Sequence, residues 1–494
     1  MAAAASTSES SRGSVIRRQT GQSRNEILRR RRRRRCGVDA GGGNKRRGLR
    51  RKGRRRLAAD VPPKRIQDAP FHLFFLFHHC DIIAAACLPS RPLRAARHRG
   101  DAGAVYAGLI RDWPKRVCFG PGSIAQLPRL MADLGARHAM VACGKSVAGG
   151  EMLVKIRAAL GERLVGVFAD IPAHTPYQCV QKATAQLKSL GADAVISVGG
   201  GSAIDCGKGI ALLFATGGVF EPYIVDYTNK GMQRAPMPAP GLVHIAVPTT
   251  AGSASDVMPT AAIRDPEAGK KMLFWDERMV PDATVLDPEM AVYAGPQLSA
   301  ATGMTAMARA IECLYSAHRH PISTGLALHS ARLLRRALPR SVTAPGDLEA
   351  RADCQMAAIM SGTASINAMV SVVHAIGHIV GGRYGLQHGI SHSILLAPAM
   401  RRMLPAIGED QYYALEAMGG ARDAHSADAA GRRAADLLQA MVDMLPLPRR
   451  LRELGITEAD LPAIAAATMG DYMIVNVPRP MSASDVESLL REAL

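Results

Sequence analysis

The chain has 494 residues, too many for one hydrophobic core, so at least two domains are expected. The formal net charge is +20, but residues 1–100 hold 26 of the 62 basic and only 6 of the 42 acidic side chains. The rest of the chain is therefore electrically neutral, and its charge says little about its partners. Nine cysteines without a C-x-x-C pair exclude a disulfide framework and a zinc ribbon, and they favour a reducing, cytoplasmic compartment.

Residues 1–100 form a basic, low-complexity leader that includes seven consecutive arginines, Arg29 to Arg35. Like charges at this density repel one another and cannot bury a core, so disorder is predicted. Such an arm could bind nucleic acid or another polyanion by counterion release. No interleaved aromatic residues or zinc spacing support a specific reader, so we expect no nucleic-acid partner. The apolar stretch 71–88 is broken by histidines and Asp81, so we expect no membrane span.

Strands and helices alternate from Val105 to about residue 290. A short strand and glycine turn at 116–122 lead into an amphipathic helix at 123–134. Buried strands are then predicted at 139–143, 165–168, 194–198 and 243–247, with helices at 151–160 and 203–214. This alternation predicts a parallel sheet with helices on both faces, and ligands of such sheets bind at the carboxyl ends of the strands.

From Leu298 the alternation ceases and helical patterns continue almost to the C-terminus. The predicted helices are 302–315, 324–338, 348–360, 364–379, 427–444 and 484–494. The sequence therefore predicts an α/β domain at 101–290 and an all-helical domain at 291–494. A small-molecule site is favoured in the cleft between two such halves.

A glycine-rich turn, Gly199-Gly200-Gly201-Ser202, joins the strand at 194–198 to the helix that follows. Three glycines allow backbone N–H groups to approach a pyrophosphate, and the helix N-terminus adds its positive dipole end. A tight strand-to-helix turn without a ligand has the same pattern, and the motif is not G-x-G-x-x-G. Its place after a buried strand favours phosphate binding.

Four histidines lie between Val373 and Pro398. His374 and His378 are four residues apart in an apolar run and share one face of a predicted helix. We expect Gly381-Gly382 to end that helix, and His388 and His392 to begin a second one. A single histidine on an apolar face is usually a core residue, whereas four around a glycine turn indicate a site, because imidazole binds metals and carries protons.

Several motifs, taken in order, resemble the iron-type (group III) alcohol dehydrogenase superfamily, which includes maleylacetate reductases. They are FGPGSIAQLP, GADAVISVGGGSAIDCGKGIAL, PTTAGSASDVMPTA, VPDATVLDPEM, TGMTAMARAIECLY, the histidine stretch and NVPRPMSASDVESLL. The resemblance implies a dehydroquinate synthase-like fold, with an N-terminal parallel-sheet dinucleotide-binding domain and a C-terminal helical domain that closes over the nicotinamide.

The resemblance implies NAD or NADP as cofactor. Gly199, Gly200, Gly201 and Ser202 would hold the pyrophosphate with Asp205 nearby, and Thr249, Thr250 and Ser253 would line the rest of the dinucleotide cleft. Many NAD-preferring members carry an acidic residue after the first strand. Gly144 stands there in this chain, followed by Lys145, so a 2′-phosphate is not repelled.

The metal site departs from the family pattern. His374 and His388 match two of the four ligands of the metal-using members, and His378 matches a histidine near the substrate carbonyl. Thr305 and Arg309 stand at the other two ligand positions, where the family has Asp and His. Threonine is a poor ligand and arginine adds a positive charge, which puts Fe or Zn binding in doubt. Arg309 could instead hold a substrate carboxylate.

The sequence therefore predicts an NAD(P)-dependent oxidoreductase that interconverts an alcohol and a carbonyl compound, with His378 as the proton carrier and Arg309 as a second catalytic residue. The expected partner is a small alcohol, aldehyde or keto acid. Subunit contacts are common in the family, which leaves a homo-oligomer open. Two alternatives remain: metal-independent, maleylacetate reductase-like reduction of an acidic substrate, and a catalytically weakened homologue whose basic arm binds a polyanion.

Overall fold

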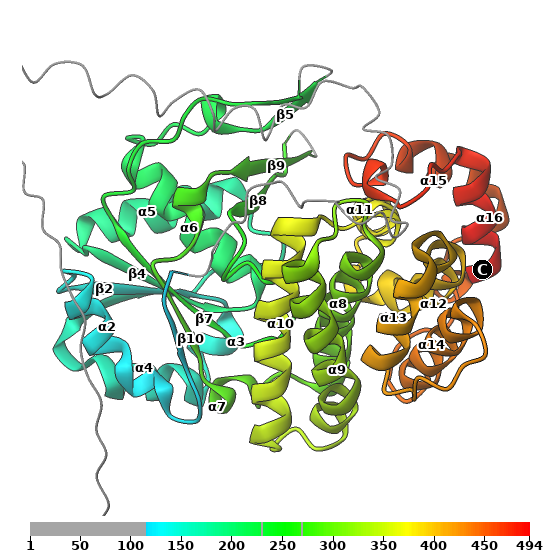
Figure 1. The fold of residues 1–494 in the computed structure, drawn as a ribbon. Helices are drawn as coiled ribbons and strands as arrows, with labels where there is room; N and C mark the ends of the chain where they lie inside the picture. The colour runs from blue at the N-terminus through cyan, green and yellow to red at the C-terminus, as the bar shows by residue number, and fades with distance from the viewer. Residues whose placement is uncertain (1–114, 229–230, 268–269) are drawn as a thin grey trace, which may run out of the picture. The chain divides into compact units, whose positions relative to one another are not determined.

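The computed structural model describes residues 115–228, 231–267 and 270–494. The predicted leader 1–100, and with it the hypothesis of a polyanion-binding arm, lies outside these residues. Within them, a parallel sheet flanked by helices is followed along the chain by a bundle of helices (Figure 1).

Six strands form the central sheet, and every pairing in it is parallel. They lie in the order β1 (Val117–Phe119), β10 (Ala283–Leu286), β7 (Val243–Pro248), β4 (Ala194–Gly199), β2 (Ala139–Cys143) and β3 (Leu164–Phe168). The register pairs Gly199 at the end of β4 with Pro248 at the end of β7. The glycine turn and the segment after β7 therefore leave the sheet side by side, at the edge where ligands of parallel sheets bind.

Helices cover both faces of this sheet, as the alternation predicts. Met140 and Ala142 of β2 pack with α5 (Tyr177–Ser189) and α6 (Gly201–Ala215) on one face. The alternate residues of β2 pack with η1 (Ser123–Gln126), α2 (Leu127–Asp133) and α4 (Glu151–Leu160) on the other. This period of two, with every β2 side chain buried, is what a central strand of a doubly covered sheet requires.

Several elements of the first half were not predicted. These are α3 (Lys145–Ala148), α5, α7 (Pro288–Ala291), β10, and the antiparallel hairpins β5 (Asp226–Thr228) with β6 (Gly231–Gln233) and β8 (Thr260–Asp265) with β9 (Lys270–Trp275). Hairpin β8–β9 bears on the site, because the backbone N–H of Arg264 in β8 donates to Thr175 O beside the glycine turn.

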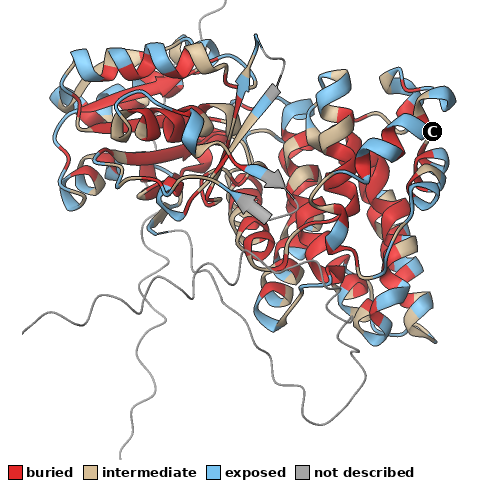
Figure 2. Cartoon of the chain, turned by 90° about the horizontal axis from the view of Figure 1, so that it is seen from above, coloured by how far each residue is buried: buried red, intermediate tan, exposed pale blue. Residues whose placement is uncertain are grey.

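The second half is helical. Its helices are α8 (Pro296–Tyr315), α9 (Pro321–Thr343), α10 (Leu348–Ala368), α11 (Val372–Tyr384), α12 (His388–Met403), α13 (Gln411–Ala417), α14 (Ala427–Val442), α15 (Leu461–Thr468) and α16 (Ala483–Ala493). Helix α8 is buried along almost its whole length, as Figure 2 shows for the inner helices of this half. It carries two of the positions that the sequence singles out, Thr305 and Arg309.

Two predicted helix boundaries are wrong. The helices expected at 348–360 and 364–379 are divided elsewhere: α10 runs on to Ala368, and the chain turns at Met369, which has a positive φ of 62°. Gly381-Gly382 does not end α11, which continues to Tyr384 and stops at Gly385 with φ 68°. Glycine tolerates helical angles, and only Gly385 takes the left-handed conformation that ends a helix.

No single described helix combines the length and apolar character needed to cross a membrane. Helices α10 and α11 meet that test only when joined, and they are bent by 107° at the break between them.

Candidate functional site

The glycine turn after β4 is packed so closely that side chains are excluded. Gly199 has a φ of 147°, and a Cβ on it would lie 2.8 Å from the Cβ of Ala203. A Cβ on Gly201 would lie 2.9 Å from the Cβ of Ser253. Helix α6 starts at Gly201 and runs for 15 residues, so its positive dipole end lies at the turn. Bare backbone at a long helix N-terminus fits a bound phosphate.

The segment 249–255 after β7 lies directly against this turn. The backbone N–H of Thr249 donates to Gly199 O at 3.0 Å. A Cβ on Gly200 would lie 3.2 Å from Thr250 Oγ1. The structure thus brings the predicted residues Thr249, Thr250 and Ser253 together with the three glycines, and their role in a dinucleotide cleft stays a prediction. We call residues 249–255 the nucleotide loop.

Ser202 and Asp205, at the start of α6, are both engaged with other parts of the chain. Ser202 Oγ accepts from the backbone N–H of His174 at 3.1 Å. Asp205 Oδ2 accepts from the backbone N–H of Ala262 in β8 at 3.2 Å. Burial raises the pKa of the Asp205 carboxyl above its ordinary value. Asp205 therefore ties α6 to β8, and its role near a pyrophosphate stays a prediction.

The four histidines of α11 and α12 lie in one cluster. The ring centroids of His374 and His392 are 4.3 Å apart, and those of His378 and His388 are 5.4 Å apart. The ring centroids of His388 and His392 are 5.8 Å apart. Burial, followed by repulsion from neighbouring imidazoles and cations, lowers the pKa of His388 and His392 well below the ordinary value. These two rings are therefore neutral at physiological pH.

Glu312 on α8 orients His374. Its carboxylate is fully buried, and Oε2 accepts from or shares a proton with His374 Nδ1. Oε1 accepts from the backbone N–H of Ser371 at 3.2 Å and of Val373 at 2.8 Å. His374 Nε2 is buried and has no hydrogen-bond partner among the described residues. Sequence reasoning missed Glu312, although a lone carboxylate in an apolar helix, seven residues after Thr305, was a visible signal.

Asp471 orients His378 in a similar way. His378 Nδ1 lies 2.8 Å from Asp471 Oδ2, and its side chain is 30% exposed while that of Asp471 is 9% exposed. The ring of Tyr472 stacks on His378 with centroids 6.0 Å apart. A carboxylate at Nδ1 holds the proton there and leaves Nε2 for another partner. His378 is thus oriented and still reachable, and Asp471 was not singled out by the sequence.

Thr305 and Arg309 do not complete a metal site. Thr305 Oγ1 donates to Ala301 O at 3.2 Å within its own helix. Arg309 is buried, and its guanidinium donates to backbone carbonyls of the nucleotide loop. Burial lowers the pKa of Arg309 to about 10, so it is still a cation at neutral pH. No three His, Cys, Asp or Glu side chains of the described ranges are arranged to hold an ion. These residues do not fit the family's metal.

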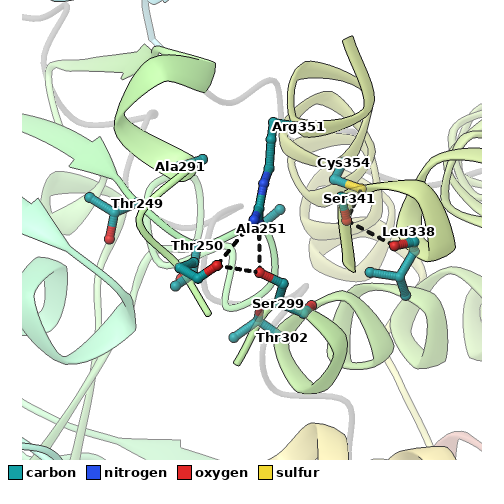
Figure 3. Close-up of a pocket in the computed structure, with 11 residues that line it drawn as sticks. Thr249, Thr250, Ala251, Ala291, Ser299, Thr302, Leu338, Ser341, Arg351 and Cys354 are labelled. Carbon is teal, nitrogen blue, oxygen red and sulfur yellow. Dashed lines mark hydrogen bonds between the residues drawn. The ribbon is translucent and has the colours of Figure 1, made fainter. Parts of the chain in front are cut away.

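Figure 3 shows a pocket between the nucleotide loop and α8 to α10. Its lining includes Thr249 and Thr250, together with the buried Arg351, which donates to Ser299 Oγ at 2.6 Å. The predicted catalytic residues His378 and Arg309 do not line it. It is lined instead mainly by residues of the nucleotide loop and of α8, α9 and α10.

Comparison with known proteins gives the same family for both halves. Residues 114–288 match the model described as iron-containing alcohol dehydrogenase, and residues 299–494 match the C-terminal model of that family. The 1,3-propanediol dehydrogenase of Klebsiella pneumoniae is 30% identical over 382 residues, which are 76% of this chain and 96% of that protein.

Two solved structures support the assignment. A 1,3-propanediol oxidoreductase superposes with a TM-score of 0.72 at 28% identity, over 77% of this chain and 98% of its own. Maleylacetate reductase from Agrobacterium tumefaciens gives a TM-score of 0.66 at 26% identity, over 79% and 99%. These matches confirm the dehydroquinate synthase-like fold. The chain is an enzyme of the oxidoreductase class and belongs to the iron-containing alcohol dehydrogenase family.

Proposed function

We propose that this protein is an NAD(P)-dependent oxidoreductase that interconverts a small alcohol and the corresponding carbonyl compound. The observation that carries the proposal is the arrangement of α8. Arg309 of this helix binds the nucleotide loop, and Glu312, three residues later, binds His374 of the histidine cluster. One helix thereby connects the predicted cofactor cleft to the predicted catalytic histidines, which supports a reaction between groups bound at the two places.

The glycine turn and the nucleotide loop would hold the dinucleotide. Backbone N–H groups at Gly199 to Ser202 would take the pyrophosphate, and the hydroxyls of Thr249, Thr250 and Ser253 would line the cleft. When bound, the nicotinamide supplies or accepts the hydride. Lys145 after β2 is exposed, and its Nζ lies 3.5 Å from Asp170 Oδ1. The position directly after β2 is Gly144, so no carboxylate at that position would repel a 2′-phosphate. NADP is therefore permitted beside NAD.

His378 would carry the proton. With Nδ1 held by Asp471, the Nε2 atom is free to donate to the oxygen that gains charge as a carbonyl is reduced, or to accept from an alcohol. Its partial exposure provides a route to water for the next proton. The neutral rings of His388 and His392 would shape the dry side of the same site.

A second candidate is the metal-independent reduction of an acidic substrate. The presence of Thr305 and Arg309 at two ligand positions favours it, and the fold matches a maleylacetate reductase. A buried arginine and Lys271 both add positive potential at His388, which suits an anionic substrate. Direct binding of a carboxylate by Arg309 stays a prediction, because the structure shows its guanidinium engaged with the nucleotide loop.

The full-length protein tests both candidates. NADH and NADPH oxidation is followed against small aldehydes, hydroxyaldehydes and four- to six-carbon keto acids, with and without a chelator and with added Fe²⁺. We expect oxidation of at least one cofactor with one of these classes. Measurable dinucleotide binding without any turnover would support the catalytically weakened homologue, and absence of dinucleotide binding would overturn the proposal.

A further inference from the structure

Arg309 joins three parts of the chain that are far apart in sequence. Its Nη2 donates to Gly252 O at 2.6 Å and to Ser253 O at 3.1 Å, both in the nucleotide loop. Its Nη1 donates to Ser361 Oγ on α10 at 3.2 Å. Because Arg309 itself belongs to α8, a single side chain connects α8, α10 and the loop.

The nucleotide loop, to which Arg309 donates, is packed closely against α8, α10 and the glycine turn. A Cβ on Gly252 would lie 2.2 Å from Thr302 O of α8, and a Cβ on Gly362 of α10 would lie 2.6 Å from the Cβ of Ala254. On its other side, Ser253 lies against Gly201 of the glycine turn. Because the packing is so close, a shift of the loop at Gly252 or Ser253 must also shift the cleft that faces the dinucleotide.

The chemistry of the contact requires arginine. A guanidinium has donors in a fixed planar fork, so one nitrogen can serve two adjacent carbonyls while the other reaches a hydroxyl. A lysine ammonium keeps the charge, but its single nitrogen cannot span the loop and α10 at these distances. The charge is retained in the interior because the carbonyl dipoles replace part of the lost hydration.

We propose that Arg309 is a positioning residue that holds the nucleotide loop in its binding conformation and couples it to the histidine cluster through α8. The coupling passes through Glu312, one helical turn further along, which fixes His374. Arg309, at a position where metal-using members of the family have a ligand, thus supports cofactor binding through the nucleotide loop. This inference rests on the proposed function, since it takes the loop to bind a dinucleotide.

Arg309→Lys tests the proposal, and Arg351→Lys is its matched control. Arg351 is also buried, and its guanidinium donates to two backbone carbonyls, Pro345 O and Ala294 O. It also donates to the hydroxyl of Ser299 (Figure 3). Arg351 lines the pocket of Figure 3 together with Thr249 and Thr250, but it makes no hydrogen bond to the nucleotide loop among those found in the described residues. The two substitutions therefore remove similar bonds from a similar environment.

We expect Arg309→Lys to raise the Kd for NADH or NADPH at least tenfold, measured by nucleotide fluorescence. The KM for the carbonyl substrate should stay within threefold. Arg309→Lys and Arg351→Lys should lower Tm by similar amounts. Arg351→Lys should leave the nucleotide Kd within twofold of the wild-type value. Equal nucleotide affinity in wild type and Arg309→Lys, or equal weakening by both substitutions, would overturn the proposal.

Two further results complete the test. If Arg309→Lys does not fold, Ser361→Ala decides, because it removes only one acceptor: a threefold or greater rise in nucleotide Kd supports the proposal, and an unchanged Kd contradicts it. If the wild-type protein binds neither dinucleotide, the proposed function fails first, and the inference that rests on it fails too. An intact wild-type affinity with unchanged variants contradicts the inference alone.

Discussion

The glycine turn of the α/β half and the histidine cluster of the helical half differ in how far they keep the family's pattern. At the turn, every predicted residue from Gly199 to Gly201 is held in contact with the nucleotide loop. At the cluster, His374 and His388 are retained, but two other ligand positions have become Thr305 and Arg309. Backbone N–H groups and a helix dipole can bind a phosphate, and most side-chain substitutions leave them in place. A metal site depends on each of its ligand side chains, so one or two substitutions are enough to change it.

The largest effect is expected from a substitution at His378 in the histidine cluster. Replacing it with glutamine should lower kcat by about 10²- to 10⁴-fold, because the proton carrier is lost, and should leave the dinucleotide Kd within twofold. Steady-state rates and nucleotide titration measure the two effects. His329→Gln, at an exposed position of α9, is the control and should behave like wild type. A His378→Gln enzyme with wild-type kcat would remove this residue from the chemistry.

A substitution at Gly201 addresses the other region. The new Cβ of Gly201→Ala would meet Ser253 at 2.9 Å, so the nucleotide loop must move and the dinucleotide Kd should rise about 10- to 100-fold. Gly325→Ala in α9, where a Cβ meets no atom within 4 Å, serves as the control. Isothermal titration with NADH and NADPH gives the affinities. Tight binding by Gly201→Ala would show that the loop does not form the cleft.

Acid stability probes the sheet that carries the turn. His244 on β7 is buried, with Nε2 2.7 Å from Ser197 Oγ, and burial lowers its pKa to about 3. The unfolded chain takes up this proton below a pH of about 6.5 and the folded protein does not, so stability falls as pH decreases from about 6.5 towards 3. Between pH 6.5 and 5.0 this residue should cost about 1.5 kcal/mol of unfolding free energy.

Urea unfolding of wild type and His244→Gln at these two pH values measures the difference. The variant should lose about 1.5 kcal/mol less stability than wild type over the interval. His329→Gln again provides the exposed control. Parallel losses in wild type and His244→Gln would mean that this histidine is protonated in the folded state.

The smallest effect is expected from chelation. Because Thr305 and Arg309 do not provide the missing donors, incubation of the active enzyme with a strong chelator should change kcat less than twofold. Elemental analysis of the purified protein should find Fe and Zn well below one ion per chain. A large loss of rate that Fe²⁺ restores would contradict this and would bring the histidine cluster back to the family's pattern.

Local patterns predicted much of the fold and part of the site. The alternation of buried strands and helices indicated the parallel sheet, and Gly199 to Ser202 marked the turn correctly, because both depend on neighbours in sequence. The end of α11 was wrong, since Gly381 and Gly382 permit a helix to stop but do not require it, and the left-handed residue is Gly385. The hairpin β8–β9 had no comparable signal and was missed.

The sequence by itself determined the family, the glycine turn and the four histidines, because each is a matter of residue type and short spacing. Only the tertiary structure decided what these residues do. Glu312 and His374 are 62 positions apart, His378 and Asp471 are 93 apart, and Arg309 reaches back 57 residues to Gly252. Which donor meets which acceptor over such distances depends on how whole helices pack, and that packing made Arg309 a support of the nucleotide loop.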